Sequence, residues 1–94
     1  MLYMLMCEDK ADSQSLRLAT RDAHLGYVGN NAESIRLAGP LLGDDGERMV
    51  GSLFLIEADS ADEVRAFHEQ DPYTQAGLWG NVVLRPFRQV LPRD

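Results

Sequence analysis

Residues 49–67, MVGSLFLIEADSADEVRAF, say most about how this chain folds. Alternate residues of a strand point to opposite faces, and both faces of residues 49–58 are apolar. Ser60 then stands three positions before Glu63, the spacing of a capping box, in which a serine caps a new helix and a glutamate reaches back to its start. The stretch predicts a strand buried on both sides, followed at once by a helix that buries Ala61, Val64 and Phe67.

The chain before this stretch predicts a strand and a helix. Residues 1–7 are apolar on both faces and stop at Glu8-Asp9-Lys10. From about Ser13 the spacing of apolar residues changes to three and four, which predicts a helix that frays near Gly29-Asn30-Asn31. The apolar stripe that we expect this helix to bury consists of Leu16, Ala19, Ala23 and Tyr27.

Two further strands complete the pattern. Residues 34–42 are typical of a short strand interrupted by Gly39-Pro40, and the polar residues 43–47 suit the turn of a hairpin. Asp71-Pro72 predicts a short helical turn that ends at Gly77, with the aspartate as cap and the proline at the first helical position. Residues 79–91 are predicted as the last strand, in which Pro86 indicates a bulge or an exposed edge.

The resulting order, β-α-β-β-α-β, is that of the ferredoxin-like α+β fold. It predicts one domain over residues 1–94, with a four-stranded antiparallel sheet and two helices on one face. A sheet face left in water normally alternates apolar with polar residues, whereas at least two of these strands are apolar on both faces. We therefore expect a homodimer in which two sheets pack face to face, a dimeric α+β barrel.

Composition excludes several classes of function. The net charge of -6 argues against nucleic acid as a partner, and the basic residues are too scattered for a membrane patch. No apolar run approaches the roughly 18 residues of a membrane span, and residues 1–7 lack the features of a signal peptide. The single cysteine, Cys7, allows no internal disulfide. We expect a cytoplasmic protein.

The first helix carries the leading candidate for chemistry. On a wheel of roughly 100° per residue, Arg17, Arg21, His24 and Val28 form a second stripe about a quarter-turn from the apolar one. His24 therefore stands at the border of the buried face, beside two arginines. Such a histidine commonly packs its ring and keeps its tip in water. Histidine is also the side chain that ordinarily titrates between pH 5 and 8, so His24 is a candidate proton shuttle.

Asp71 and Ser52 are the polar residues that suit supporting roles. A capping carboxylate accepts backbone N–H bonds and stays ionised, so Asp71 suits orienting a histidine better than acting as an acid. Ser52 interrupts an apolar strand without a Gly-x-Ser-x-Gly context, which favours a hydrogen bond into a pocket over nucleophilic attack. Cys7, His24, His68 and Asp71 lack metal-ligand spacing, and the glycines match no phosphate loop, so we expect neither a metal nor a cofactor.

Short motifs over nearly the whole chain resemble the YciI family in order and spacing. They are Met1-Leu2-Tyr3, Asp9-Lys10-Ala11-Asp12-Ser13, Arg17-x3-Arg21-x2-His24-Leu25, Ala38-Gly39-Pro40, Gly51-Ser52, Asp71-Pro72-Tyr73-x2-Ala76-Gly77 and Val83-x2-Pro86-Phe87. The resemblance implies a dimeric α+β barrel with a pocket in which His24 and Asp71 are the proposed catalytic pair. The family is similar in fold to muconolactone isomerase, and one relative eliminates chloride from a chlorinated hydroxyquinol. Relatives often carry a longer loop between Pro40 and Gly51, so the substrate range could differ here.

Two functions follow as expectations. The first is a cofactor-free lyase, isomerase or dehydrochlorinase-like enzyme acting on a small organic acid, in which His24 moves the proton and Asp71 fixes its tautomer. The residues expected to bind this anionic ligand are Arg17 or Arg21, at a carboxylate, and Ser52 and Tyr73, through orienting hydrogen bonds. The alternative is a non-catalytic dimeric module that binds a small anion or serves a partner protein. A third reading, from other proteins of this barrel type, is a cofactor-independent oxygenase or a haem binder.

Overall fold

The structure, a computed structural model, describes residues 1–93 and confirms the predicted fold class. Strands and helices follow one another in the order β-α-β-β-α-β, with a short helical turn before β2 and another after α2. Their bounds are β1 Leu2–Asp9, α1 Gln14–Asn30, β2 Ile35–Leu42, β3 Met49–Glu57, α2 Ala61–Gln70, α3 Pro72–Gln75 and β4 Trp79–Phe87, with a 3-10 turn at Ala32–Ser34.

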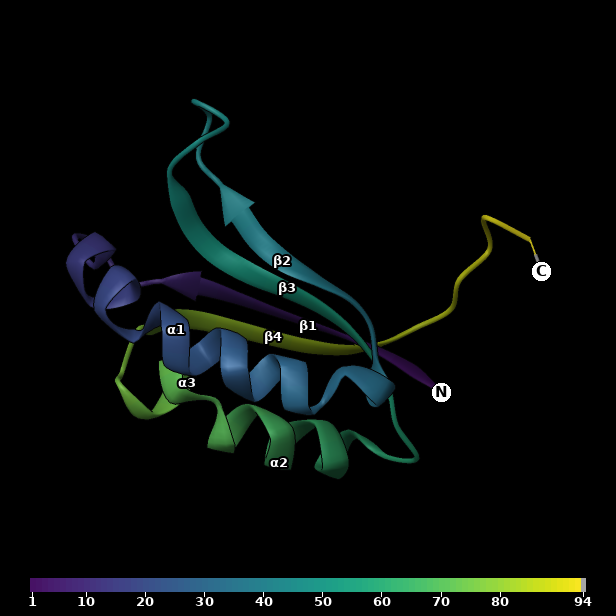
Figure 1. The fold of residues 1–94 in the computed structure, drawn as a ribbon. Coiled ribbons are helices and arrows are strands. Elements are labelled where there is room, and N and C mark those ends of the chain that lie inside the picture. The colour runs from purple at the N-terminus through teal and green to yellow at the C-terminus, as the bar shows by residue number, and fades with distance from the viewer. Residues whose placement is uncertain (94) are drawn as a thin grey trace.

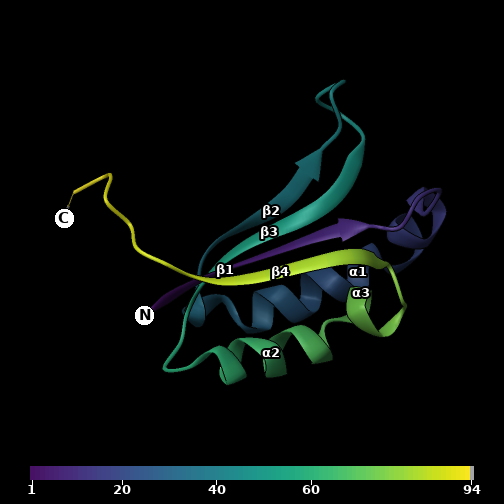
Figure 2. The same cartoon turned by 180° about the vertical axis from the view of Figure 1, so that it is seen from behind.

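The four strands form one antiparallel sheet in the order β2-β3-β1-β4, so β1 and β3 are central and β2 and β4 are the edges. Helices α1 and α2 run side by side along one face of this sheet and leave the other face bare, as views from opposite sides agree (Figures 1 and 2). The hairpin end of β2 and β3 rises beyond the helices (Figure 1). One face is therefore covered and the other is free.

The core lies between the central strands and the helices. Leu5 of β1 and Phe54 of β3 are cross-strand partners, each 1% exposed, and Cys7 and Val64 are completely buried beside them. Cross-strand partners share one face of a sheet, so this cluster defines the helix-facing side. The side chains of α1 that point at the sheet are consequently held against a closely packed base.

Helix α1 buries a different stripe from the one that its apolar spacing predicts. Arg17 and His24 face inward and are 2% and 8% exposed, whereas Leu16, Ala19 and Ala23 are exposed. Burying polar side chains is costly unless they are hydrogen-bonded, and acidic partners from other elements satisfy both of them here. The predicted apolar stripe is wrong at Leu16, Ala19 and Ala23, and Arg17 and His24 of the neighbouring stripe are buried instead.

Strand ends differ from prediction where a neighbouring strand decides them. β4 stops at Phe87 rather than at residue 91, because Phe87 pairs with Leu2, the first residue of β1. Val90 beyond it is 71% exposed. Pro86 lies on an edge strand, as predicted, and β2 runs through Gly39-Pro40 without interruption because it too is an edge strand, where proline is tolerated.

The remaining local signals behave nearly as predicted. Ser60 caps α2 by accepting a hydrogen bond from the backbone N–H of Glu63, at 3.3 Å. The Glu63 carboxylate reaches back to the backbone N–H of Asp59, at 3.2 Å, one residue before the cap. The first strand continues two residues beyond its predicted end, to Asp9. No helix within residues 1–93 is long and apolar enough to cross a bilayer.

Candidate active site

His24 and Asp71 form a buried hydrogen-bonded pair. Nδ1 of His24 lies 2.8 Å from Oδ1 of Asp71, and the two side chains are 10% and 1% exposed. His24 comes from α1, and Asp71 comes from the junction of α2 and α3. Because Nδ1 is engaged with the carboxylate, Nε2 is the ring nitrogen that remains for another partner.

The position of Asp71 is fixed by its own stretch of chain. Asp71 caps α3, and its Oδ1 accepts the backbone N–H of Tyr73 at 3.0 Å, while Pro72 occupies the first helical turn as predicted. One carboxylate oxygen thus serves both the cap and His24, which is possible because a carboxylate has about four acceptor positions. The local sequence Asp-Pro-Tyr therefore holds the carboxylate that orients the histidine.

The ring of Tyr73 fixes His24 from the side. The two rings stack with centroids 3.9 Å apart and planes 18° apart. The guanidinium carbon of Arg17 lies 4.7 Å from the centre of the same tyrosine ring. Arg17 and His24 are seven residues apart on α1, about 10.5 Å along the helix axis, so the tyrosine ring lies between them. Burial raises the pKa of the Tyr73 phenol although Arg17 and Arg21 oppose this, so it is protonated at neutral pH.

Arg17 is paired with Asp9, which neutralises its charge. Its Nε and Nη2 donate to the two oxygens of Asp9 at 2.7 and 3.0 Å, a bidentate ion pair. Nη2 also donates to Ser52 Oγ at 3.1 Å, and Nη1 donates to Tyr73 Oη at 3.5 Å. Burial by itself would lower the pKa of Arg17, but the hydrogen bond and the charge of Asp9 outweigh it and raise that pKa. The arginine's charge is therefore neutralised inside the protein.

A pocket of about 100 Å³ opens beside these groups, between α1 and the strands β2 and β3. An apolar cavity of about 150 Å³ holds benzene, so this pocket can enclose at most part of one small ring, and its open side takes the rest. The residues that line it with polar atoms are Arg17, Arg21, His24, Ser52 and Tyr73, and the apolar walls include Leu25, Val28, Ala38, Pro40, Met49 and Phe54. Asp71 is not part of the wall, because it lies behind His24. The pocket is thus apolar with a few polar groups, as small-molecule sites usually are.

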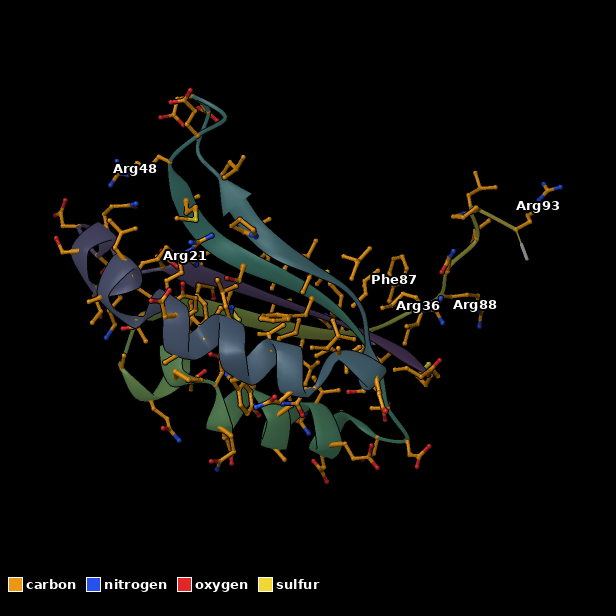
Figure 3. The ribbon with its side chains drawn as sticks, viewed as in Figure 1. Arg21, Arg36, Arg48, Phe87, Arg88 and Arg93 are labelled. Carbon is orange, nitrogen blue, oxygen red and sulfur yellow. The ribbon has the colours of Figure 1, made fainter. Side chains whose placement is uncertain are left out.

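Arg21 supplies the remaining positive charge of the pocket. It is exposed on α1, one turn from both Arg17 and His24, and it lies on the side of the helix nearest the β2–β3 hairpin (Figure 3). Within residues 1–93 it takes part in no ion pair. Arg21, unlike Arg17, has a guanidinium available to a bound anion.

All six residues predicted for the site are brought together. Five of them, including His24, line the pocket, and the sixth, Asp71, holds His24 from behind. Sequence reasoning did not identify Asp9, which fixes Arg17. The signal was available: Asp9 stands two positions after the buried Cys7, so its side chain is on the same, helix-facing side of the strand.

Other reactive side chains lie outside the pocket. The Cys7 thiol is completely buried, and burial together with the charges of Asp71 and Asp9 raises its pKa to about 12, so it remains a thiol. His68 on α2 contacts Thr74, and burial lowers its pKa although Asp71 and Glu69 oppose this. Residues 1–93 contain no cluster of three His, Cys, Asp or Glu side chains that could hold a metal ion.

Comparison with known proteins shows the family. The family model of the YCII-related domain matches residues 1–88. Over an alignment of 97 positions, the chain is 35% identical to Protein YciI of Escherichia coli, and the match covers 96% of this chain and 99% of that protein. An uncharacterized protein of Haemophilus influenzae is 29% identical over the same length. The chain belongs to the YciI family, as its sequence motifs predict.

A solved structure supplies a neighbour of named activity. The 5-chloro-2-hydroxyhydroquinone dehydrochlorinase of Burkholderia phenoliruptrix, in complex with 2,5-dihydroxybenzoquinone, is 34% identical to this chain. It superposes with a TM-score of 0.90, and the match covers 100% of both chains. The two proteins therefore share one fold over their full lengths.

Proposed function

We propose that this chain is an acid–base enzyme of the lyase, isomerase or dehydrochlorinase type, which moves a proton on a small organic acid by means of His24 and Asp71. The observation that carries the proposal is the 2.8 Å contact between His24 Nδ1 and Asp71 Oδ1 at the wall of a pocket. Asp71 holds the imidazole as the tautomer protonated at Nδ1 and stabilises the imidazolium that forms. Nε2 is then the atom that takes the proton from the substrate and returns it.

The contacts around His24 support its role as a general base, because they fix the orientation of the imidazole ring. Asp71 fixes the ring in its plane through Nδ1, and Tyr73 fixes its tilt by stacking. A general base must lie within hydrogen-bond reach of the proton that it removes, and a ring held on two sides returns to one position in each turnover. These contacts need no cofactor, so the proposed proton transfer uses side chains alone.

The charges around the pocket support an anionic substrate. Asp9 neutralises Arg17 and Asp71 faces His24, so Arg21 supplies the charge that a ligand carboxylate or phenolate can use. Arginine binds such groups through paired N–H donors. The dehydrochlorinase of Burkholderia phenoliruptrix takes a hydroxylated ring by its name and by its bound ligand. A small, hydroxylated or carboxylated ring is therefore the class of substrate that we propose.

The test follows proton exchange, because proton transfer is the step that the proposed reaction types share. The protein is incubated in D₂O with a panel of small cyclic acids, lactones and 5-chloro-2-hydroxyhydroquinone, and deuterium uptake and chloride release are measured. We expect His24→Gln to lower the rate by about 10²–10⁴-fold, the usual contribution of a positioned acid or base. His68→Gln is the matched control, because His68 lies on α2 outside the pocket. Full activity in His24→Gln would overturn the proposal.

The same experiment distinguishes the enzyme from the alternative, a non-catalytic module that binds a small anion. Arg21 would hold the anion in either case, so its loss weakens binding under both hypotheses. A wild-type protein that binds ring acids in calorimetry, yet exchanges no proton on any of them, would favour the module over the enzyme.

We also propose that the protein is a homodimer, which pairs through the bare face of its sheet. Met4 and Leu55 are cross-strand partners on that face, as are Met6 and Leu53. They alternate with the buried residues of the core and therefore point away from the helices. A face this apolar favours a partner sheet over water.

A further inference from the structure

Two buried hydroxyl groups at the pocket have protons without a protein acceptor. Ser52 is 4% exposed and Tyr73 is 1% exposed, and both line the pocket. Each accepts a hydrogen bond from Arg17, at 3.1 Å for Ser52 Oγ and 3.5 Å for Tyr73 Oη. Among residues 1–93 no carbonyl, carboxylate or other oxygen accepts a hydrogen bond from either hydroxyl. Buried polar groups in native proteins normally use their hydrogen-bonding capacity.

Arg17 decides the direction in which these hydroxyls can act. A guanidinium only donates and does not lose its proton in proteins. Its ion pair with Asp9 holds it in place, with both carboxylate oxygens engaged. A hydroxyl that accepts from such a group keeps its own O–H free to donate elsewhere. Ser52 and Tyr73 are therefore polarised as donors before any ligand arrives.

We propose that Ser52 and Tyr73 form a donor pair that binds an acceptor oxygen of the substrate, a carbonyl or phenolate oxygen, while His24 acts on a carbon or oxygen of the same ring. This inference rests on the proposed function and deepens it. Arg17 becomes a positioning residue, which acts through the two hydroxyls. The subsite is neutral overall, because Asp9 cancels the charge of Arg17.

The proposal limits the class of substrate. A group that only donates, such as an ammonium, would meet two donors and leave them unpaired, which costs binding free energy. A ring that bears a carbonyl or phenolate oxygen satisfies both hydroxyls at once. Negative charge that develops on this oxygen when His24 removes a proton is stabilised by donors already in position. The pair would thus bind an enolate or phenolate more tightly than the neutral substrate.

The test uses 2,5-dihydroxybenzoquinone as the probe, because its ring carries carbonyl oxygens and the related dehydrochlorinase binds it. Calorimetry compares the wild type with Ser52→Ala and Tyr73→Phe, and infrared difference spectroscopy follows the carbonyl stretch of the bound probe. Tyr73→Phe removes one oxygen and keeps the ring that stacks on His24. Tyr27→Phe is the control, since the Tyr27 hydroxyl donates to the Phe67 carbonyl outside this pocket.

We expect each of the two variants to weaken binding about tenfold or more, the effect of losing a hydrogen bond to a charged acceptor. The carbonyl stretch of the probe should lie at a lower frequency in the wild type than in water and move back in Ser52→Ala and Tyr73→Phe. Tyr27→Phe should match the wild type in both measurements. If the hydroxyls had a purely structural role, the carbonyl band of the bound probe would have the same frequency in Ser52→Ala, Tyr73→Phe and the wild type.

The outcomes separate this subsite from the proposed function. Equal affinity for the probe and an unchanged carbonyl band in all variants would overturn the donor pair. If proton exchange still depended on His24, the proposed enzyme function would be unaffected by that result. A wild-type protein that does not bind the probe would also overturn the donor pair. Loss of binding in Ser52→Ala or Tyr73→Phe without proton exchange on any substrate would support the subsite and overturn the enzyme.

Discussion

Asp9 carries the negative charge that the buried guanidinium of Arg17 needs as its partner. It neutralises Arg17 in a pair whose side chains are only 8% and 3% exposed. We expect Asp9→Asn to destabilise the protein by about 3–5 kcal/mol, because breaking a buried pair leaves a buried cation without its counter-charge. Asp62→Asn is the control. It breaks the pair with Arg65, which is exposed and worth about 0–1 kcal/mol.

The measurement is the free energy of unfolding from urea denaturation of the two variants and the wild type. Equal losses in Asp9→Asn and Asp62→Asn would contradict the assigned role of Asp9. A large loss confined to Asp9→Asn would agree with an arginine that the protein holds for positioning.

His68 predicts a pH dependence of stability. Trp79 Nε1 donates a hydrogen bond to the Thr74 hydroxyl at 2.9 Å. That hydroxyl in turn donates to Nδ1 of His68 at 3.3 Å when Nδ1 carries no proton. Burial likewise lowers the pKa of His68 in the folded protein below its usual 6.5. The unfolded chain therefore binds more protons between the two pKa values, and stability rises with pH across that window.

Stability from His68 is complete above about pH 6.5, the unfolded value, and is lost as the pH falls through the lower folded pKa. His68→Gln removes this contribution. The difference in free energy of unfolding between wild type and His68→Gln, measured by urea denaturation from pH 7.5 to 5, should fall toward acid pH. Parallel curves for the two proteins would contradict the lowered pKa.

Strand β3 needs a glycine at position 51, where it pairs with the end of β1. A Cβ built on Gly51 would clash with the backbone carbonyl oxygen of Cys7. Gly51 also precedes Ser52, so this close approach sets the position of a pocket hydroxyl. We expect Gly51→Ala to cost about 1–3 kcal/mol, the usual penalty of overpacking.

Gly39→Ala on β2 is the comparison, because a Cβ there meets nothing within 4 Å. Thermal denaturation of both variants should show a lowered melting temperature for Gly51→Ala and little change for Gly39→Ala. Similar melting temperatures for the two would mean that β3 moves away from β1 without cost.

The elements themselves were largely predictable, whereas the face that α1 buries was not. Capping signals such as Ser60 and Asp71 act within a few residues, so their effect is visible in the sequence. The inward turn of Arg17 and His24 depends on carboxylates from other elements, and helical periodicity contains no information about them. The end of β4 was unpredictable for a similar reason, since Leu2 of another strand decides it.

For the molecule as a whole, the sequence predicted the two-sided character of the sheet better than any single contact. Apolar residues lie on both faces of β1 and β3, and helices α1 and α2 cover only one of these faces (Figures 1 and 2). Local patterns predicted His24 and Asp71 one by one, and only the family resemblance joined them as a pair, because they stand 47 positions apart in the chain. Asp9 was not predicted as a site residue, because an acidic residue at the end of a strand usually lies in solvent.

The bare face of the sheet gives the last prediction, that the protein sediments with twice the mass of one chain at micromolar concentration. Leu37 and Phe87 on this side are 49% and 40% exposed, and Phe87 stands above the sheet on the side away from the helices (Figure 3). A stable interface buries about 800 Å² per partner, so the pairing that we propose would use most of this face. Leu55→Lys places a charge at its centre and should yield a monomer. Leu18→Lys, at a 57% exposed position of α1, should leave the dimer intact. A well-folded wild-type monomer would contradict the pairing, and so would a Leu55→Lys variant that remains dimeric.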